Sequence, residues 1–201
     1  MPHGAMPAPP ALRLAQEPAA DALLSADPFA LLVGMLLDQQ FPMERAFAGP
    51  RRLAERLGVE RLDPAGLAAM DPEDLAAVMA RPPVVHRYPR AMAARIQALA
   101  AVVVDTYDGD AAQVWHDPGT GRELLTRLTR LPGFGDQKAR IFLALLGKQL
   151  GVRPTGWREA AGPYGEAGAR RSVADVVDPE SLAEVRAFKR EQKQAGKAGG
   201  R

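Results

Sequence analysis

The feature that most constrains the fold is a recurring Asp-Pro dipeptide, which marks the start of helical patterns along the chain. Aspartate is a favoured N-cap, and proline is favoured at the first helical position, where its missing N–H would be unpaired anyway. The five copies are Asp27-Pro28, Asp63-Pro64, Asp71-Pro72, Asp117-Pro118 and Asp178-Pro179. We expect most of them to begin helices, and we expect the copy at Asp117, which a Gly-Thr-Gly run follows, to form only a turn.

The stretches between these starting points repeat apolar residues with the period of a helix. They are residues 29–37, 43–57, 75–79, 87–107, 122–129 and 137–150. Alanine and leucine dominate an apolar fraction of 47%, aromatic residues make up only 5%, and this composition favours helix over strand. Residues 153–170, rich in glycine and proline, are expected to form a loop or a short broken helix. Because no segment alternates as a strand does, the sequence predicts an all-α fold.

Several classes of site are excluded by residue type. The chain contains no cysteine, which excludes disulfides, a thiolate-held iron–sulfur cluster and a zinc finger. Its three histidines, His3, His86 and His116, show no ligand spacing, so we expect no metal site. We place His86, which follows two prolines, in a surface loop, with a contact to the DNA backbone as the alternative. No apolar run of membrane-spanning length and no secretory signal pattern is present, so we expect a cytoplasmic, nucleoid-associated protein without a membrane partner.

Positive charge is concentrated at the end of the chain. Residues 186–201 contain six basic residues and one acid, a local charge of +5, whereas residues 1–185 carry −3. Because the rest of the chain is not basic, it can bind nucleic acid only through a local site, to which the basic segment at the end of the chain can contribute. We divide the sequence into an N-terminal extension over 1–20, a helical domain over 21–185 and a basic flexible tail over 186–201.

The most informative stretch, residues 124–146, reads helix, tight glycine turn, helix. The turn consists of Pro132, Gly133, Phe134 and Gly135. Its two glycines can adopt backbone angles that other residues avoid, and they put no Cβ in the way of a ligand. The second helix begins with free N–H groups near residues 136–138, and such donors bind a phosphate oxygen, directly or through a cation. Lys138 adds a positive charge nearby.

The pattern L-x-x-L-P-G-F-G-x-x-x-A-x-x-F over residues 128–142 closely resembles the helix-hairpin-helix of the endonuclease III-like (HhH-GPD) base-excision DNA repair superfamily. The resemblance implies two helical lobes with a cleft between them, and a hairpin that grips the DNA backbone without reading its sequence. The hairpin contacts that it implies are Pro132, Gly133, Phe134, Gly135, Gln137 and Lys138. It also allows a monovalent cation at the hairpin, but the lack of cysteine makes this an atypical member without an iron–sulfur cluster or other cofactor.

Residues 27–42 resemble the superfamily's first barrel helix and the glutamine loop that follows it. In that family such a glutamine enters the duplex and fills the gap left by an everted nucleotide, where its amide can hydrogen-bond the orphaned base. Gln40 takes this role in our interpretation, with Gln39 as the alternative register. Residues 67–100 match more weakly, so the resemblance covers roughly residues 27–152.

The sequence departs from the family pattern at both catalytic positions. The family aspartate lies downstream of the hairpin at a position that here falls on residues 155–157, Thr-Gly-Trp, and the nearest carboxylate beyond them is Glu159. The family lysine position is occupied by Gln137, and Lys138 lies one residue later, about 100° around the helix. Glu159 and Lys138 are therefore the catalytic candidates. For Lys138 the choice lies between a Schiff-base nucleophile and a phosphate contact, and we prefer the phosphate contact.

Three functions fit these patterns. The first is a monofunctional DNA N-glycosylase that acts on a damaged or mispaired base in double-stranded DNA, with Trp115, Trp157 or Tyr164 as candidates for stacking on the everted base, unless they belong to the core. The second is a non-catalytic protein that binds damaged or distorted DNA, which the missing aspartate favours. The third is a helical scaffold whose hairpin binds protein. The lesion and the oligomeric state are left open.

Overall fold

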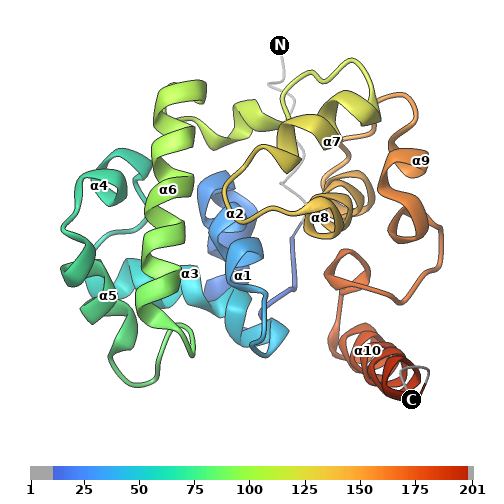
Figure 1. The fold of residues 1–201 in the computed structure, drawn as a ribbon, viewed down its shortest axis with the longest axis horizontal. Helices are drawn as coiled ribbons and strands as arrows, with labels where there is room; N and C mark the ends of the chain where they lie inside the picture. The colour runs from blue at the N-terminus through green and yellow to red at the C-terminus, as the bar shows by residue number, and fades with distance from the viewer. Residues whose placement is uncertain (1–10, 199–201) are drawn as a thin grey trace, which may run out of the picture.

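The computed structural model describes residues 11–198 and consists of helices joined by short loops (Figure 1). The α-helices within these residues are α1 (Pro18–Ala26), α2 (Pro28–Leu37), α3 (Met43–Leu57), α4 (Pro64–Ala69), α5 (Pro72–Ala80), α6 (Pro89–Tyr107), α7 (Gly121–Thr129), α8 (Asp136–Gln149), α9 (Trp157–Ala161) and α10 (Pro179–Ala198). Three short 3-10 helices accompany them, η1 (Ala111–Val114), η2 (Gly162–Gly165) and η3 (Val173–Asp175). The described residues form no strand, only an isolated bridge between Thr120 and Thr155. The predicted all-α fold is confirmed.

Four of the five Asp-Pro pairs begin helices, as the sequence predicted. The carboxylate of Asp27 accepts hydrogen bonds from the first free N–H groups of α2, at Phe29 and Ala30. Comparable side-chain caps are formed by Asp63, Asp71 and Asp178. The pair at Asp117 lies in a bend between η1 and α7. The capping chemistry of aspartate therefore fixes where these helices start.

The central helix is α2, whose residues from Phe29 to Leu37 are all buried. On one side it packs against α1, α3 and α6, and on the other side the turn between α7 and α8 reaches it at Leu36. Figure 1 shows α1–α6 gathered into one lobe and α7–α10 into a second, so α2 lies at the boundary between the two lobes. Within the described residues no single helix is long and apolar enough to cross a membrane; only α1 and α2 together pass such a test, as a pair bent by 119°.

The described parts of the two segments that were expected to flank the helical domain are folded. Leu12 and Leu14 are buried in the core and α1 begins at Pro18, so the described part of the expected extension over 1–20 belongs to the folded domain. The described part of the expected tail is helical, because α10 continues through residue 186 to Ala198. Its alanine, lysine, glutamine and glutamate residues are good helix formers, which explains the continuation. The remainder of both segments lies outside the described residues.

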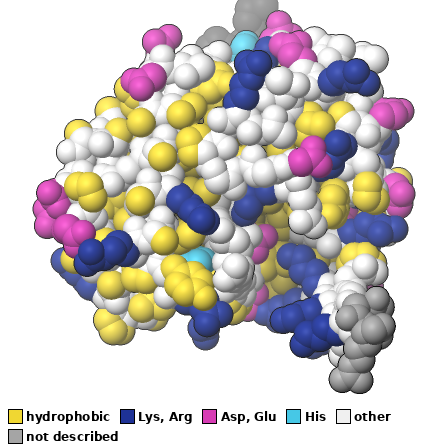
Figure 2. Space-filling view, in the orientation of Figure 1, with side chains coloured by type: hydrophobic (Ala, Val, Ile, Leu, Met, Phe, Trp, Pro, Cys, Tyr) yellow, Lys and Arg dark blue, Asp and Glu magenta, His cyan; other side chains and the backbone are white. Residues whose placement is uncertain are grey.

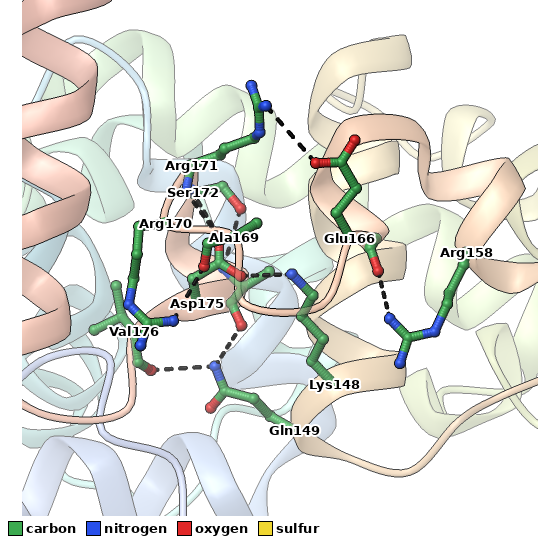
Figure 3. Close-up of polar contacts among 12 residues, drawn as sticks. Lys148, Gln149, Arg158, Glu166, Ala169, Arg170, Arg171, Ser172, Asp175 and Val176 are labelled. Carbon is green, nitrogen blue, oxygen red and sulfur yellow. Dashed lines mark hydrogen bonds and ion pairs between the residues drawn. The ribbon is translucent and has the colours of Figure 1, made fainter.

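A buried ion pair holds the loop that leads into α10 (Figure 3). Lys148 Nζ, near the end of α8, lies 2.5 Å from Oδ1 of the buried Asp175 in η3. The other oxygen of Asp175 accepts two main-chain N–H groups from the preceding loop, and Gln149 donates to two carbonyl groups around η3. Because every member of this network has a partner, the loop that leads into α10 is fixed against α8.

Candidate nucleic-acid interface

Apolar side chains hold the hairpin between α7 and α8 from the inside. Leu128, Leu131 and Phe134 are buried, and the Phe134 ring meets the Phe142 ring edge-on with 5.9 Å between centroids. Main-chain hydrogen bonds from Leu131 to Leu128 and from Phe134 to Leu131 close the turn. The structure therefore corrects the assignment of Phe134 as a DNA contact, because its ring supports the turn from within; Pro132 beside it is half-buried.

The two hairpin glycines have different roles. Gly133 has a φ of +79°, and a Cβ on it would lie 2.3 Å from Leu36 Cδ1, so the fold itself requires glycine there. Gly135 has an ordinary φ of −69°, and a Cβ on it would meet nothing within 4 Å. The fold would accept another residue at position 135. Because glycine has no side chain, the surface in front of the start of α8 stays open.

That open surface carries unpaired main-chain donors. The N–H groups of residues 135–138 have no hydrogen-bond acceptor within the described residues, and no side chain caps α8. Gly135, Asp136 and Gln137 are exposed, and the Asp136 carboxylate is turned along the helix to Arg140, 2.8 Å away. Free N–H groups at the positive end of a 14-residue helix form a site for an anion such as a phosphate. A monovalent cation at this hairpin stays a prediction.

The loop that follows α2 holds its two glutamines in opposite ways. Gln39 is tied to the protein: its Nε2 donates to Leu36 O at 2.7 Å, and its Oε1 accepts from Arg95 Nη1 at 2.5 Å. Gln40 is exposed, has a φ of +51°, and makes no side-chain hydrogen bond within the described residues. A left-handed backbone is uncommon for glutamine and is found where surroundings impose it, often at functional sites. The free amide of Gln40 is therefore the one available to a ligand.

His86 fixes the backbone of this loop. Its ring is fully buried and packs against Phe41, with 4.8 Å between centroids. Nε2 lies 3.0 Å from Gln39 O and Nδ1 accepts from the Tyr88 N–H, so the ring is neutral with its proton on Nε2. Burial lowers the pKa of His86, which keeps the ring in this form. The prediction of a surface histidine is wrong, because its ring faces the loop and not the solvent.

Lys138 joins the hairpin to the glutamine loop. Its Nζ donates to Met35 O at 2.5 Å and to Asp38 O at 2.9 Å, at the C-terminal end of α2. Burial lowers the pKa of Lys138 to about 8, although the nearby charge of Asp38 opposes this shift. Two of its three N–H donors are used within the protein. The ammonium group is therefore directed between the lobes, which differs from the phosphate contact that we preferred from the sequence.

A cavity of about 490 Å³ lies beside Lys138, between the end of α2, the start of α8, η2 and α10. The residues that line it are Met35, Asp38, Gln39, Gln137, Lys138, Ile141, Pro163, Tyr164, Arg171, Phe188, Lys189 and Gln192. Gln137 donates to the Tyr164 hydroxyl at 2.9 Å across this lining. Figure 2 shows lysine and arginine side chains gathered where α10 faces the rest of the molecule. The cavity thus combines an aromatic wall with positive charge, next to the hairpin donors.

A comparison with protein families supports the same interpretation. The model of the "HhH-GPD superfamily base excision DNA repair protein" family matches residues 33–196, which include the hairpin, the glutamine loop and the cavity. The chain belongs to the HhH-GPD superfamily. It is therefore a DNA-binding protein of base excision repair. A comparison with curated proteins gave no match.

In this HhH-GPD protein the two predicted catalytic residues lie apart. Glu159 is exposed and lines a separate cavity with Thr120, Arg122 and Arg140, whereas Lys138 lines the cavity under α10. The structure does not bring Glu159 and Lys138 together. The described residues hold no group of three or more His, Asp or Glu side chains placed to bind a metal ion.

The aromatic candidates divide between core and cavity. Trp157 is buried against Gly147, where a Cβ would lie 2.4 Å from the indole, and Trp115 is half-buried against Phe142. Tyr164 alone among the three lines the cavity. A buried tryptophan is explained by packing, which leaves Tyr164 as the candidate that faces a ligand.

Sequence reasoning missed most of the other cavity residues, among them Asp38, Arg171, Phe188 and Lys189. Asp38 carried a signal, because it directly precedes the two glutamines in L-D-Q-Q. The other three lie in segments that follow the recognised motifs, and no local pattern marks them. Only the path of the chain through η3 into α10 brings them over the start of α8.

Proposed function

We propose that this protein is a monofunctional DNA N-glycosylase that removes a damaged or mispaired base from double-stranded DNA. The observation that carries the proposal is a cavity with Lys138 in its wall, whose lining includes the chain neighbours of two other features. Gln39 in the lining precedes the exposed Gln40, and Gln137 in the lining follows the open N–H donors that begin at Gly135. An enzyme of this kind must hold the backbone, fill the vacated stack and enclose the everted base.

Each of these three features meets one of the three requirements. A phosphate of the damaged strand binds the free N–H groups at the start of α8. Gln40 enters the duplex next to that contact, and the everted base enters the cavity, where Tyr164 offers an aromatic surface and Gln137 an amide. Exposed Lys189, Lys193 and Lys197 of α10 add positive charge on the other side of the cavity.

The test is excision from duplexes that carry single defined lesions or mispairs. The purified protein is incubated with a broad panel, and alkali then converts each abasic site to a strand break. We expect breaks only at the lesion, and only after alkali, because a monofunctional enzyme leaves the abasic strand intact. Borohydride trapping with abasic DNA examines Lys138 separately, with Lys138→Met as the control, because an amine with a pKa of about 8 is partly unprotonated near neutral pH.

A second function, binding of damaged or distorted DNA without catalysis, is favoured by one observation. Glu159, the carboxylate nearest to the family position, lines a different cavity from Lys138. This function predicts tighter binding to abasic or mismatched duplex than to intact duplex, falling as salt rises, with no break at any lesion of the panel.

A further inference from the structure

Asp38 occupies the junction of two adjoining cavities. It is the residue after α2, half-buried, and it lines the cavity of Lys138. It also lines a neighbouring cavity of about 240 Å³ between Phe41 of the glutamine loop and Arg190 of α10. Lys189 lines both cavities as well, so Asp38 and Lys189 lie between the cavity on the hairpin side and the cavity at the glutamine loop.

The fold uses the main chain of Asp38 but not its carboxylate. The main-chain N–H donates to Gly34 O at 3.2 Å, and the carbonyl accepts from Lys138 Nζ. Within the described residues the carboxylate accepts no hydrogen bond and forms no ion pair. Among the described residues that line the Lys138 cavity it is the sole carboxylate. A half-buried carboxylate without a structural partner, placed at a cavity between cations, is free to act on a ligand.

The neighbouring acids are already engaged in structural contacts. Asp175 is held by Lys148 and Asp136 by Arg140. Glu44 pairs with Arg186 through Oε1; its Oε2 is buried without a partner, but Glu44 lines only the smaller cavity and not the cavity of Lys138. Glu159 faces another cavity. Among the described residues downstream of the hairpin, none lines the Lys138 cavity with a carboxylate.

We propose that Asp38 is the catalytic carboxylate, supplied from the end of α2. The inference rests on the proposed function. In the reaction the bond between C1′ and the base nitrogen breaks, and its electron pair leaves with the base. Asp38 stabilises the positive charge that develops on the sugar and accepts a proton from the water that forms the new C1′–O bond. The departing base takes up a proton from the Lys138 ammonium group, and solvent protons restore that group as Asp38 releases its own.

The first test is a binding comparison that needs no turnover. A duplex with a cationic pyrrolidine nucleotide, which mimics the charged sugar, is compared with a duplex that carries the neutral tetrahydrofuran analogue. We expect the wild type to prefer the cationic duplex, and we expect Asp38→Asn to reduce this preference at least about tenfold, because Lys138, Arg171 and Lys189 then line the cavity without an opposing carboxylate. Glu159→Gln should leave the preference unchanged. An unchanged preference in Asp38→Asn, or none in the wild type, overturns the proposal.

The second test is excision on whichever lesion the wild type cleaves. We expect Asp38→Asn to lower the rate of base release about 100-fold or more, with unchanged melting temperature and binding to intact duplex, because the carboxylate has no structural partner. Asp38→Glu should recover part of the rate. Excision within about threefold of wild type in Asp38→Asn overturns the assignment. If no lesion is cleaved but the Asp38-dependent cation preference persists, the proposed function fails while the location of the carboxylate stands.

Discussion

The hairpin turn and the glutamine loop meet at the same cavity, but they are built in opposite ways. The hairpin, residues 131–138, is shaped by its own neighbours in sequence, and it presents bare main-chain donors to solvent. The glutamine loop, residues 38–41, is shaped by distant residues: His86 and Arg95 hold Gln39, and Lys138 holds the carbonyl of Asp38. The hairpin conformation therefore depends mainly on local contacts, and that of the glutamine loop on tertiary contacts.

This difference in contacts indicates which residues of each region can be substituted without unfolding it. Glycine gives the hairpin its shape at Gly133 and leaves position 135 unconstrained, so that position is available to the ligand. The glutamine loop holds Gln40 at a φ of +51°, and such a conformation persists only while surrounding contacts impose it. A change at position 135 of the hairpin should therefore lose function without losing stability, whereas a change in a residue that holds the glutamine loop, such as His86, should lose both together.

The largest expected effect tests the hairpin half of this comparison. Gly135→Asp should weaken binding to duplex DNA by about 2–3 kcal/mol, because the new carboxylate repels phosphate and caps the same N–H groups. The same cap should keep the melting temperature equal or raise it, because Gly135 already has N-cap backbone angles. The measurements are fluorescence anisotropy with a labelled duplex and thermal unfolding.

The neutral Gly135→Ser variant is the matched control for charge. It caps α8 without repelling phosphate, so its loss of affinity should be smaller than that of Gly135→Asp. If both folded variants bind DNA as the wild type does, the hairpin is not the DNA clamp, and a hairpin that binds protein becomes the better explanation.

The same contrast explains how much could be predicted from the sequence. Helix starts at Asp-Pro pairs and the glycine turn depend on residues adjacent in the chain, and these predictions are confirmed. His86 could not be placed, because its partner, the Gln39 carbonyl, lies 47 residues away, and nothing near His86 in sequence indicates burial. The direction of Lys138 depends likewise on α2, 100 residues earlier in the chain. Local chemistry is readable from sequence; the pairing of remote segments is not.

A second prediction tests the glutamine-loop half. His86→Phe keeps the ring volume beside Phe41 but leaves the Gln39 carbonyl and the Tyr88 N–H without partners. We expect the free energy of unfolding to fall by about 1–3 kcal/mol, measured by urea denaturation. Discrimination between abasic and intact duplex should fall as well. A variant that loses stability but keeps full discrimination would show that His86 supports the fold and not the position of Gln40.

A smaller effect is expected at the tip of the same loop. Gln40→Asn keeps an amide and tolerates the left-handed backbone better than glutamine, but its side chain reaches less far. The preference for abasic over intact duplex should fall by about 1 kcal/mol, with no loss of stability. Gln39→Asn is the control in the tied position: it should lose stability, because the contacts with Leu36 and Arg95 need the longer side chain. The reverse pattern would assign the duplex-entering role to Gln39.

The smallest effect concerns Lys138, which connects the hairpin to the glutamine loop. Charged groups face its ammonium from three helices: Asp38 at the end of α2, Arg95 on α6 and Lys189 on α10. Because burial lowers the folded pKa to about 8, the unfolded chain binds more protons than the folded protein around and above that pH. The free energy of unfolding should therefore rise with pH, by about 0.4 kcal/mol between pH 7 and pH 8 relative to Lys138→Met. Denaturation of both proteins at the two pH values measures this difference, and buffer effects common to both cancel. Equal pH dependence in the two proteins would mean that the ammonium stays hydrated, and the two regions would then be joined by packing alone.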